Sequence, residues 1–198
     1  MNFSKPFNLN LPDSEILYFK DFLNKSEAEF YFESLKTNVP WQQDNIKVYG
    51  KVYAQPRLTA LYSNNSKPYS YSNITMHPHE FSKELLAIKQ KVEHVVSKVE
   101  FTTCLLNLYR DGKDSNGWHA DNEKELGENP IIASVTLGQE RFFHLRHKKD
   151  KSLKHKILLQ HGSLLLMKGK TQHYWQHQIA KTAKPISERI NATFRIIK

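Results

Sequence analysis

The sequence predicts an α+β, mainly β fold, a sandwich or barrel of short strands with helices packed outside it. Short runs rich in Val, Ile, Leu and Phe follow residue 101, with turn residues between them. Two segments before residue 100 carry helical periodicity instead. A chain of 198 residues can form one sizeable domain, burying roughly 70% of its unfolded surface. Because no repeat or low-complexity linker interrupts the chain, we expect a single domain over residues 1–198.

The first predicted helix covers residues 26–37. Ser26 and Glu29 are spaced as in a capping box, and a helix here would bury Phe30 and Leu35. The second predicted helix covers residues 80–99. Its apolar side chains recur in steps of three and four, which places them along one helical face: Phe81, Leu85, Ile88, Val92, Val95 and Val99.

The predicted strands occupy the second half of the chain. They cover residues 102–110, 131–138, 142–147, 156–160, 163–168, 172–179 and 189–197. Turn-forming pairs separate them, among them Asn116-Gly117 and His161-Gly162. We therefore expect the sheet core in residues 101–198. Residues 45–75 are polar and rich in tyrosine, which indicates loops and hairpins that cover another part of the protein.

Composition limits the class of protein. The net charge of +9 and the pI of about 9.5 favour a polyanionic partner. Cys104 is the one cysteine, which excludes a disulfide framework and favours a reducing compartment. The first twenty residues contain no signal-peptide core, and no stretch has transmembrane length. We expect a soluble intracellular protein with no membrane partner, cytoplasmic in a bacterium or nuclear in a eukaryote, and a monomer.

His119 and Asp121 form a candidate metal site. Alternate residues of a strand point to the same face, so the two side chains can bind one ion together. A third ligand would come from the segment 172–179, where the spacing leaves His173 and His177 both possible. Two imidazoles and one carboxylate on one side of the ion suit non-haem Fe(II) and leave the opposite side open. The pair His77 and His79 has the same spacing, but we interpret it as surface because it lacks this context.

Two arginines near the C-terminus add a second element to the site. Arg189 and Arg195 lie six residues apart in RINATFR and therefore share a face of one strand. Their guanidinium groups supply the fixed cationic forks that a dicarboxylate needs. Asn107 and Tyr109 share a face of another strand, directly before the candidate metal ligands.

These motifs resemble those of a known family. The run NLYRDGKDSNGWHADNEKELGENPIIASVTLGQERFFHLRHK, followed by HGSLLLMKG, YWQHQI and RINATFR, is similar to the AlkB-type Fe(II)/2-oxoglutarate dioxygenases. The resemblance covers about residues 45–198 and is greatest to the subgroup that repairs alkylated bases in duplex DNA. It implies a double-stranded β-helix, or jelly roll, with two or more flanking N-terminal helices and a nucleotide-recognition lid over residues 45–75.

The resemblance also implies a role for each site residue. It makes His119, Asp121 and His177 the iron ligands and catalytic centre. It places Arg189 on the distal carboxylate of 2-oxoglutarate, Arg195 near the iron-bound end, and four further residues in the same pocket: Asn107, Tyr109, Asn191 and Thr193. VYGKVYAQPR resembles the finger hairpin of the subgroup, with Tyr49 as a wedge in the base stack. The residues expected to contact the substrate base and its strand are Val48, Tyr49, Gly50, Arg57, Tyr69, Ser70, Tyr71, Asn122 and Glu123.

The activity implied is oxidative demethylation of DNA bases. With Fe(II), 2-oxoglutarate and O2, such an enzyme hydroxylates the N-methyl group of 1-methyladenine or 3-methylcytosine, and formaldehyde leaves. The co-substrate becomes succinate and CO2. These lesions are cationic, and a pocket with Tyr69, Tyr71 and Glu123 suits a flat cation. The blocked Watson–Crick edge also lowers the cost of flipping the base.

A basic segment predicts contacts with the nucleic-acid backbone. Residues 141–156 contain seven Lys or Arg and one acid, a local charge of +6. The phosphate contacts expected come from Arg146, Lys148, Lys149, Lys151, Lys181 and Lys184. The alternatives are the same chemistry on RNA, a zinc hydrolase, or a non-catalytic nucleic-acid-binding jelly roll. The paired arginines argue against zinc, since zinc hydrolysis needs no keto-acid clamp.

Overall fold

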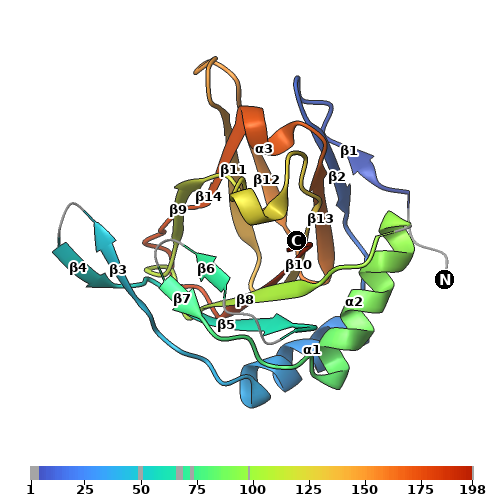
Figure 1. The fold of residues 1–198 in the computed structure, drawn as a ribbon, viewed down its shortest axis with the longest axis vertical. Helices are drawn as coiled ribbons and strands as arrows, with labels where there is room; N and C mark the ends of the chain where they lie inside the picture. The colour runs from blue at the N-terminus through green and yellow to red at the C-terminus, as the bar shows by residue number, and fades with distance from the viewer. Residues whose placement is uncertain (1–4, 49–50, 66–68, 72–73, 98, 198) are drawn as a thin grey trace.

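Two antiparallel sheets face each other in the computed structural model, which describes residues 5–48, 51–65, 69–71, 74–97 and 99–197 (Figure 1). The large sheet has the order β1-β2-β13-β10-β15-β8-β5, and the small sheet has the order β12-β11-β14-β9. The large sheet consists of β1 (Phe7–Asn8), β2 (Glu15–Phe19), β13 (Ser163–Lys168), β10 (Ile132–Gly138), β15 (Arg189–Arg195), β8 (Thr103–Tyr109) and β5 (Leu58–Ser63). The small sheet consists of β12 (Lys154–Leu159), β11 (Arg141–His147), β14 (Trp175–Ile179) and β9 (Asn116–His119). This confirms the jelly-roll arrangement that the family resemblance implied, and the sandwich of strands that the sequence pattern predicted.

Two apolar cores hold these layers together. One core lies between the sheets and includes Ile132, Phe143 and Trp175. The other lies between the large sheet and two helices, α1 (Lys25–Asn38) and α2 (Lys83–Val96). Figure 1 shows these helices on the outer side of the large sheet, away from the small one. No helix in the described residues has the length and apolar character needed to cross a membrane.

Helix α2 confirms the apolar face predicted for residues 80–99, since Leu85, Ile88 and Val92 are all fully buried. The predicted cap of α1 was wrong. Asn24 is the N-cap residue, its side chain accepts from the Glu27 N–H, and the Glu27 carboxylate accepts from the Asn24 N–H. Phe30, expected in the core, is 61% exposed, because it lies about 140° around the helix from Leu35, which is buried as expected.

The predicted strands of the second half are present, with three differences. Residues 171–174 form the short helix α3 (Thr171–Tyr174), and the strand starts only at Trp175. The pair Asn116-Gly117, expected as a turn, opens strand β9. Three strands of the large sheet, β1, β2 and β5, come from before residue 101, outside the range predicted for the core. Cys104 is buried in β8, as expected.

The other described strands that begin in the segment 45–75 form two small hairpins apart from the main sheets. One pairs β3 (Asn45–Val48) with β4 (Lys51–Ala54), and the other pairs β6 (Tyr69–Tyr71) with β7 (Ile74–Met76). Figure 1 shows both on the left, on the same side of the molecule as β9. A short 3-10 helix, η1 (Lys124–Leu126), follows the loop after β9. These pieces surround the segments that carry the candidate site.

Candidate metal and co-substrate site

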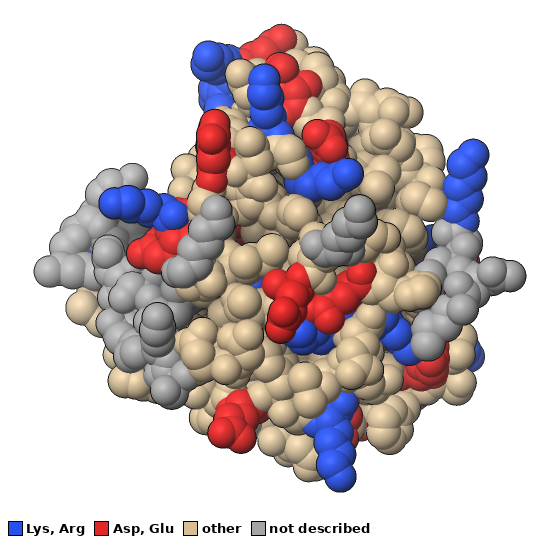
Figure 2. All heavy atoms as spheres, turned by 45° about the vertical axis from the view of Figure 1, so that its right-hand side comes forward, with Lys and Arg blue, Asp and Glu red and all other residues tan. Residues whose placement is uncertain are grey.

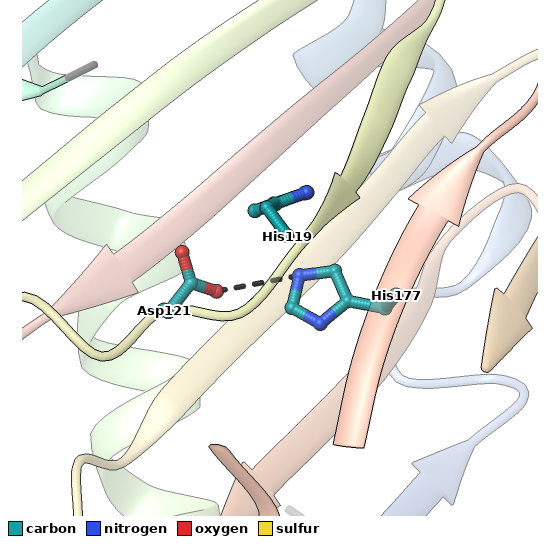
Figure 3. A group of neighbouring side chains, drawn as sticks. All are labelled: His119, Asp121 and His177. Atoms are coloured by element: carbon teal, nitrogen blue, oxygen red, sulfur yellow. Dashed lines mark ion pairs between the residues drawn. The ribbon is translucent and has the colours of Figure 1, made fainter. Parts of the chain in front are cut away.

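His119, Asp121 and His177 lie together between the two sheets. Their ligand atoms are all within 4.8 Å of one another, and they form the one group of three potential metal ligands among the described residues. Figure 3 shows the three side chains directed toward a common space. His173, the other candidate for the third ligand, is exposed on α3 and contacts Asn129 instead. The structure therefore supports His177, and it leaves His77 and His79 exposed at the surface.

Strand pairing explains how residues so distant in sequence meet. His119 in β9 lies directly opposite His177 in β14, and their ring centroids are 4.2 Å apart. Asp121 lies in the loop after β9 ends, rather than on the strand as expected. Its backbone N–H donates to the Gln172 side chain at 3.0 Å, which fixes the loop. The carboxylate then reaches within 3.6 Å of His177 Nε2.

Both imidazoles are held in the neutral form that can bind a metal. The carbonyl of Gly117 lies 2.7 Å from His119 Nδ1, so this nitrogen carries the proton. The lone pair of Nε2, which accepts from Asn116 Nδ2 at 3.3 Å, is then the one that a metal would bind. The ring of His177 stacks on Phe143 at 5.0 Å. Burial and the neighbouring His119 lower the pKa of His177 to about 3. A neutral imidazole has no proton to lose before it binds a metal.

Arg195 holds the carboxylate of the site. Its Nη2 donates to Asp121 Oδ1 at 2.5 Å. Burial alone would raise the pKa of Asp121, but Arg195 and both histidines outweigh it and the pKa falls. Asp121 is therefore ionised, as a metal ligand must be. This contact places Arg195 beside the cluster of His119, Asp121 and His177.

A buried cavity continues from the metal ligands into the large sheet. Residues 189, 191, 193 and 195 of β15 all face it, because they alternate along the strand. Asn107 and Tyr109 of the neighbouring strand β8 face it too, opposite Asn191 and Arg189. All nine residues expected to bind iron or 2-oxoglutarate line this one cavity: Asn107, Tyr109, His119, Asp121, His177, Arg189, Asn191, Thr193 and Arg195.

Arg189 lies at the far end of this set and is 1% exposed. Its Nη2 donates to Thr136 Oγ1 at 2.9 Å, and its guanidinium lies 5.2 Å from the centre of the Tyr109 ring. Its Nε and Nη1 are buried and have no hydrogen-bond partner among the described residues. Burial lowers the pKa of Arg189 to about 10, so the group is still charged at neutral pH.

This donor set fits the expected cofactor and co-substrate. Two imidazoles and a carboxylate are the facial ligands of non-haem Fe(II). A buried guanidinium with unpaired donors calls for an anion, because an unpaired buried donor is costly. A carboxylate of 2-oxoglutarate next to Arg189 would accept from one of these nitrogens and from the second N–H of Nη2 in one fork.

Several residues that line or support the pocket escaped the sequence prediction. Thr136 and Ser134 hold Arg189 and Asn191, respectively, from β10. Their signal was present, as polar residues at alternate positions in the apolar run IIASVTLG. Gln172, which fixes the loop of Asp121, had no such signal because its partner is 51 residues away.

The residues expected to recognise the base are described in part. Tyr49 and Gly50 lie outside the described residues. Val48 ends β3, and the residues 69–71 form β6. Asn122 is exposed beside the site, and Glu123 is half-buried there. Burial raises the pKa of Glu123 despite the nearby charge of Arg195.

Arg57 lies deeper than its expected role on the substrate strand implies. It is 4% exposed, and its Nε donates to Asn107 Oδ1 at 2.6 Å. A second guanidinium nitrogen donates to the carbonyl of Ser115. The side chain thus supports the wall of the co-substrate pocket.

The basic residues expected to contact phosphates differ in their solvent exposure and in their hydrogen bonds. Lys149, Lys151, Lys181 and Lys184 are exposed. Lys148 is half-buried and donates to the carbonyl of Gln172 at 2.7 Å. Arg141, part of the same basic run, is buried and bonded to backbone carbonyls, so it cannot reach a phosphate. In the face drawn in Figure 2, blue and red side chains are interspersed, so this face has no continuous basic patch.

Comparisons with known proteins agree with this geometry. Residues 15–195 match the family model of the 2OG-Fe(II) oxygenase superfamily. Alpha-ketoglutarate-dependent dioxygenase alkB homolog 3 of Bos taurus is 41% identical over 185 residues, which cover 89% of this chain and 64% of that protein. DNA oxidative demethylase ALKBH2 of Homo sapiens is 34% identical over 183 residues, covering 87% of this chain and 70% of that protein.

The chain spans 64–66% of the length of the four alkB homolog 3 proteins that it matches. A solved structure titled "The structure of OsALKBH1" has the same fold, with a TM-score of 0.67 over 97% of this chain and 100% of that chain, at 16% identity. The chain belongs to the 2OG-Fe(II) oxygenase superfamily, and within it to the AlkB-type dioxygenases, whose cofactor is Fe(II) and whose co-substrate is 2-oxoglutarate.

Proposed function

We propose that this protein is an oxidative demethylase that repairs N-alkylated bases, such as 1-methyladenine and 3-methylcytosine, in DNA. The observation that carries the proposal is one cavity that joins the His119, Asp121 and His177 cluster to the unsatisfied guanidinium of Arg189. An oxygenase that consumes a keto acid needs both parts, a metal site and a cation that binds the keto acid. The relatives named DNA oxidative demethylase supply the substrate class.

Each residue of the site has a separate role in the proposed reaction. Bound Fe(II) and 2-oxoglutarate would supply, with O2, the oxidant that places a hydroxyl group on the N-methyl carbon. His119, Asp121 and His177 hold the metal from one side, and Arg195 keeps the Asp121 carboxylate ionised and oriented. Arg189 binds the distal carboxylate of the co-substrate and fixes its position relative to the metal. The hydroxymethyl group then leaves the base as formaldehyde, and 2-oxoglutarate leaves as succinate and CO2.

The two small hairpins are proposed to form the nucleotide-recognition lid. They stand apart from the main sheets, on the side of the molecule where β9 brings His119 to the site (Figure 1). Tyr49, Tyr69 and Tyr71 would contact the DNA from this lid, and Glu123 would face the cationic base. The residues proposed to contact phosphates are Arg146, Lys149, Lys151, Lys181 and Lys184, while Lys148 would first have to release the carbonyl of Gln172.

We further propose that the protein acts as a monomer inside the cell, where DNA is available and Cys104 stays reduced. RNA is the competing substrate, since the basic charge and the metal site serve either nucleic acid. The relatives named for DNA and the finger-like run VYGK favour DNA.

A comparison of substrates tests the proposal. Oligonucleotides with 1-methyladenine or 3-methylcytosine, prepared as single-stranded DNA, duplex DNA and RNA, would be incubated with Fe(II), ascorbate and 2-oxoglutarate. We expect the fastest loss of the methyl group on DNA, measured by mass spectrometry. Faster demethylation of RNA would overturn the DNA assignment. Succinate formation with no demethylation of any strand would overturn the substrate class but leave the oxygenase.

A further inference from the structure

The small sheet presents a second set of functional side chains on its outer face. Along β11, β12 and β14, odd-numbered residues point inward and even-numbered residues point outward, as their alternating burial shows. Trp118 of β9 lines a groove on this outer side with residues of β11 and β12. We call the following set the aromatic-basic face: Trp118, Phe142, His144, Arg146, Lys154, Lys156, Gln176 and Gln178.

The positive charges of this face lie close enough together to destabilise the folded protein. Arg146 lies directly opposite Lys154 in the antiparallel pair, and like charges in such positions destabilise a sheet. His144 lies opposite Lys156, and burial together with that lysine lowers the pKa of the imidazole, so it is neutral beside the lysine. The face contains no acidic residue, and no carboxylate of the described residues forms an ion pair with Arg146, Lys154 or Lys156. An anionic ligand along this ridge would remove the repulsion.

Aromatic rings alternate with these cations. The guanidinium of Arg146 lies 4.2 Å from the centre of the Trp118 ring, and Lys156 Nζ lies 4.3 Å from that of Phe142. The Gln176 side chain accepts from Arg146 Nε and Nη2 at 3.0 and 2.9 Å, which holds the guanidinium flat over the indole. Phe142 is 47% exposed, although it is a large apolar side chain. Flat rings beside cations are what single-stranded nucleic acids bind, through stacked bases and phosphates.

The face is connected to the active site through one strand. Trp118 and His119 are consecutive, so Trp118 points to the outer groove while His119 points into the cavity. Their strand, β9, is the edge of the small sheet. A polynucleotide that leaves the active site around this edge would therefore reach Trp118 and Arg146 first.

We propose that the aromatic-basic face binds the stretch of single-stranded DNA that flanks the target base, with phosphates on Lys154 and Lys156 and bases stacked on Trp118 and Phe142. This inference rests on the proposed function for the identity of the strand. The pairing of rings with cations favours a polynucleotide over an acidic peptide, which would use the cations and leave the rings bare.

The test compares variant K154A/K156A with wild type in binding unmodified single-stranded DNA of about 15 nucleotides, a length at the upper end of known site sizes. Removing two lysines that each neutralise a phosphate should flatten the slope of log affinity against log salt by about 1.4. The change in affinity between 50 and 200 mM salt should then be about sevenfold smaller than for wild type. Fluorescence anisotropy measures both quantities.

A matched control separates this site from a general effect of charge. K20A/K25A removes two exposed lysines near α1, on the large sheet's side of the molecule, and should keep the wild-type slope. F142A, at an exposed ring, should weaken binding about 5-fold to 150-fold without changing the slope, as expected when a stacking partner is removed. Identical slopes for K154A/K156A and K20A/K25A would overturn the proposal. So would equal competition by a polyglutamate peptide, which would indicate a protein partner.

A demethylation assay distinguishes failure of this inference from failure of the proposed function. A methylated trinucleotide occupies the active site but is too short to follow the sheet around its edge. We expect K154A/K156A to demethylate it at the wild-type rate. If wild type demethylates no oligonucleotide, the proposed function is wrong, while the binding comparison still decides whether this face binds DNA. A lower rate of the variant on the trinucleotide would place the lysines in the active site and contradict the inference.

Discussion

Arg189 offers the clearest test of how the pocket selects its co-substrate. Its Nε and Nη1 are buried without partners in the described part of the chain, and no solvent reaches them to compensate. A carboxylate of 2-oxoglutarate can accept from one of them together with the second N–H of Nη2, and each of these charge-assisted hydrogen bonds is worth about 1.5–3 kcal/mol. Loss of this pair in Arg189→Ala should weaken 2-oxoglutarate binding by about 3 kcal/mol or more, which is about 150-fold.

The assay is succinate formation as a function of 2-oxoglutarate concentration, together with the thermal stabilisation that 2-oxoglutarate confers. Both should shift to about 150-fold higher concentrations in Arg189→Ala, while DNA binding stays at the wild-type level. Arg189→Lys is the matched variant, which keeps the charge but loses the fork, and should be intermediate. An unchanged 2-oxoglutarate requirement in Arg189→Ala would refute the reasoning.

Three further predictions concern the metal site and the fold. Asp121→Ala should lose Fe(II) binding and all turnover but retain DNA binding; full activity would contradict the ligand assignment. Asn24→Ala should destabilise the protein by about 0.5–2 kcal/mol in denaturant unfolding, and Ser26→Ala by less, because Asn24 caps α1. Gly138→Ala should cost at least about 1 kcal/mol, because its φ is +79° and an added Cβ would lie 2.6 Å from a backbone oxygen. Gly117→Ala, where a Cβ meets open space, should melt like wild type.

Patterns with a short period predicted most of the fold. The steps of three and four in residues 80–99 identified the buried face of α2, and alternation identified the inward residues of β15 and β8. The N-terminal strands β1 and β2 were both missed, β1 because its two residues are too few for a period to appear and β2 because its apolar residues are consecutive rather than alternating. The cap of α1 was placed two residues late, because Ser26 and Glu29 have the same spacing as Asn24 and Glu27.

The metal site was predictable in its residue types but less so in its geometry. His119 and Asp121 were found from their spacing, although Asp121 lies beyond the strand that was expected to carry it. Spacing alone could not choose between His173 and His177, because residues 171–174 turn into a helix and redirect His173. The supporting contacts of Gln172 and Thr136 depend on which strands become neighbours, and no local pattern contains that information.

The burial of Arg57 illustrates the same limit. Its place next to the finger-like run suggested contact with the substrate strand, whereas pairing of β5 with β8 brings it to Asn107. A substitution there would act on the co-substrate pocket before it acts on DNA.

The most direct test of the central claim is the coupling of co-substrate turnover to repair. Wild type and His119→Ala would each be incubated with DNA containing 3-methylcytosine, and succinate, formaldehyde and demethylated DNA would be measured together. We predict equal amounts of all three products with wild type and none with His119→Ala. Demethylation without succinate, or with His119→Ala at the wild-type rate, would contradict it.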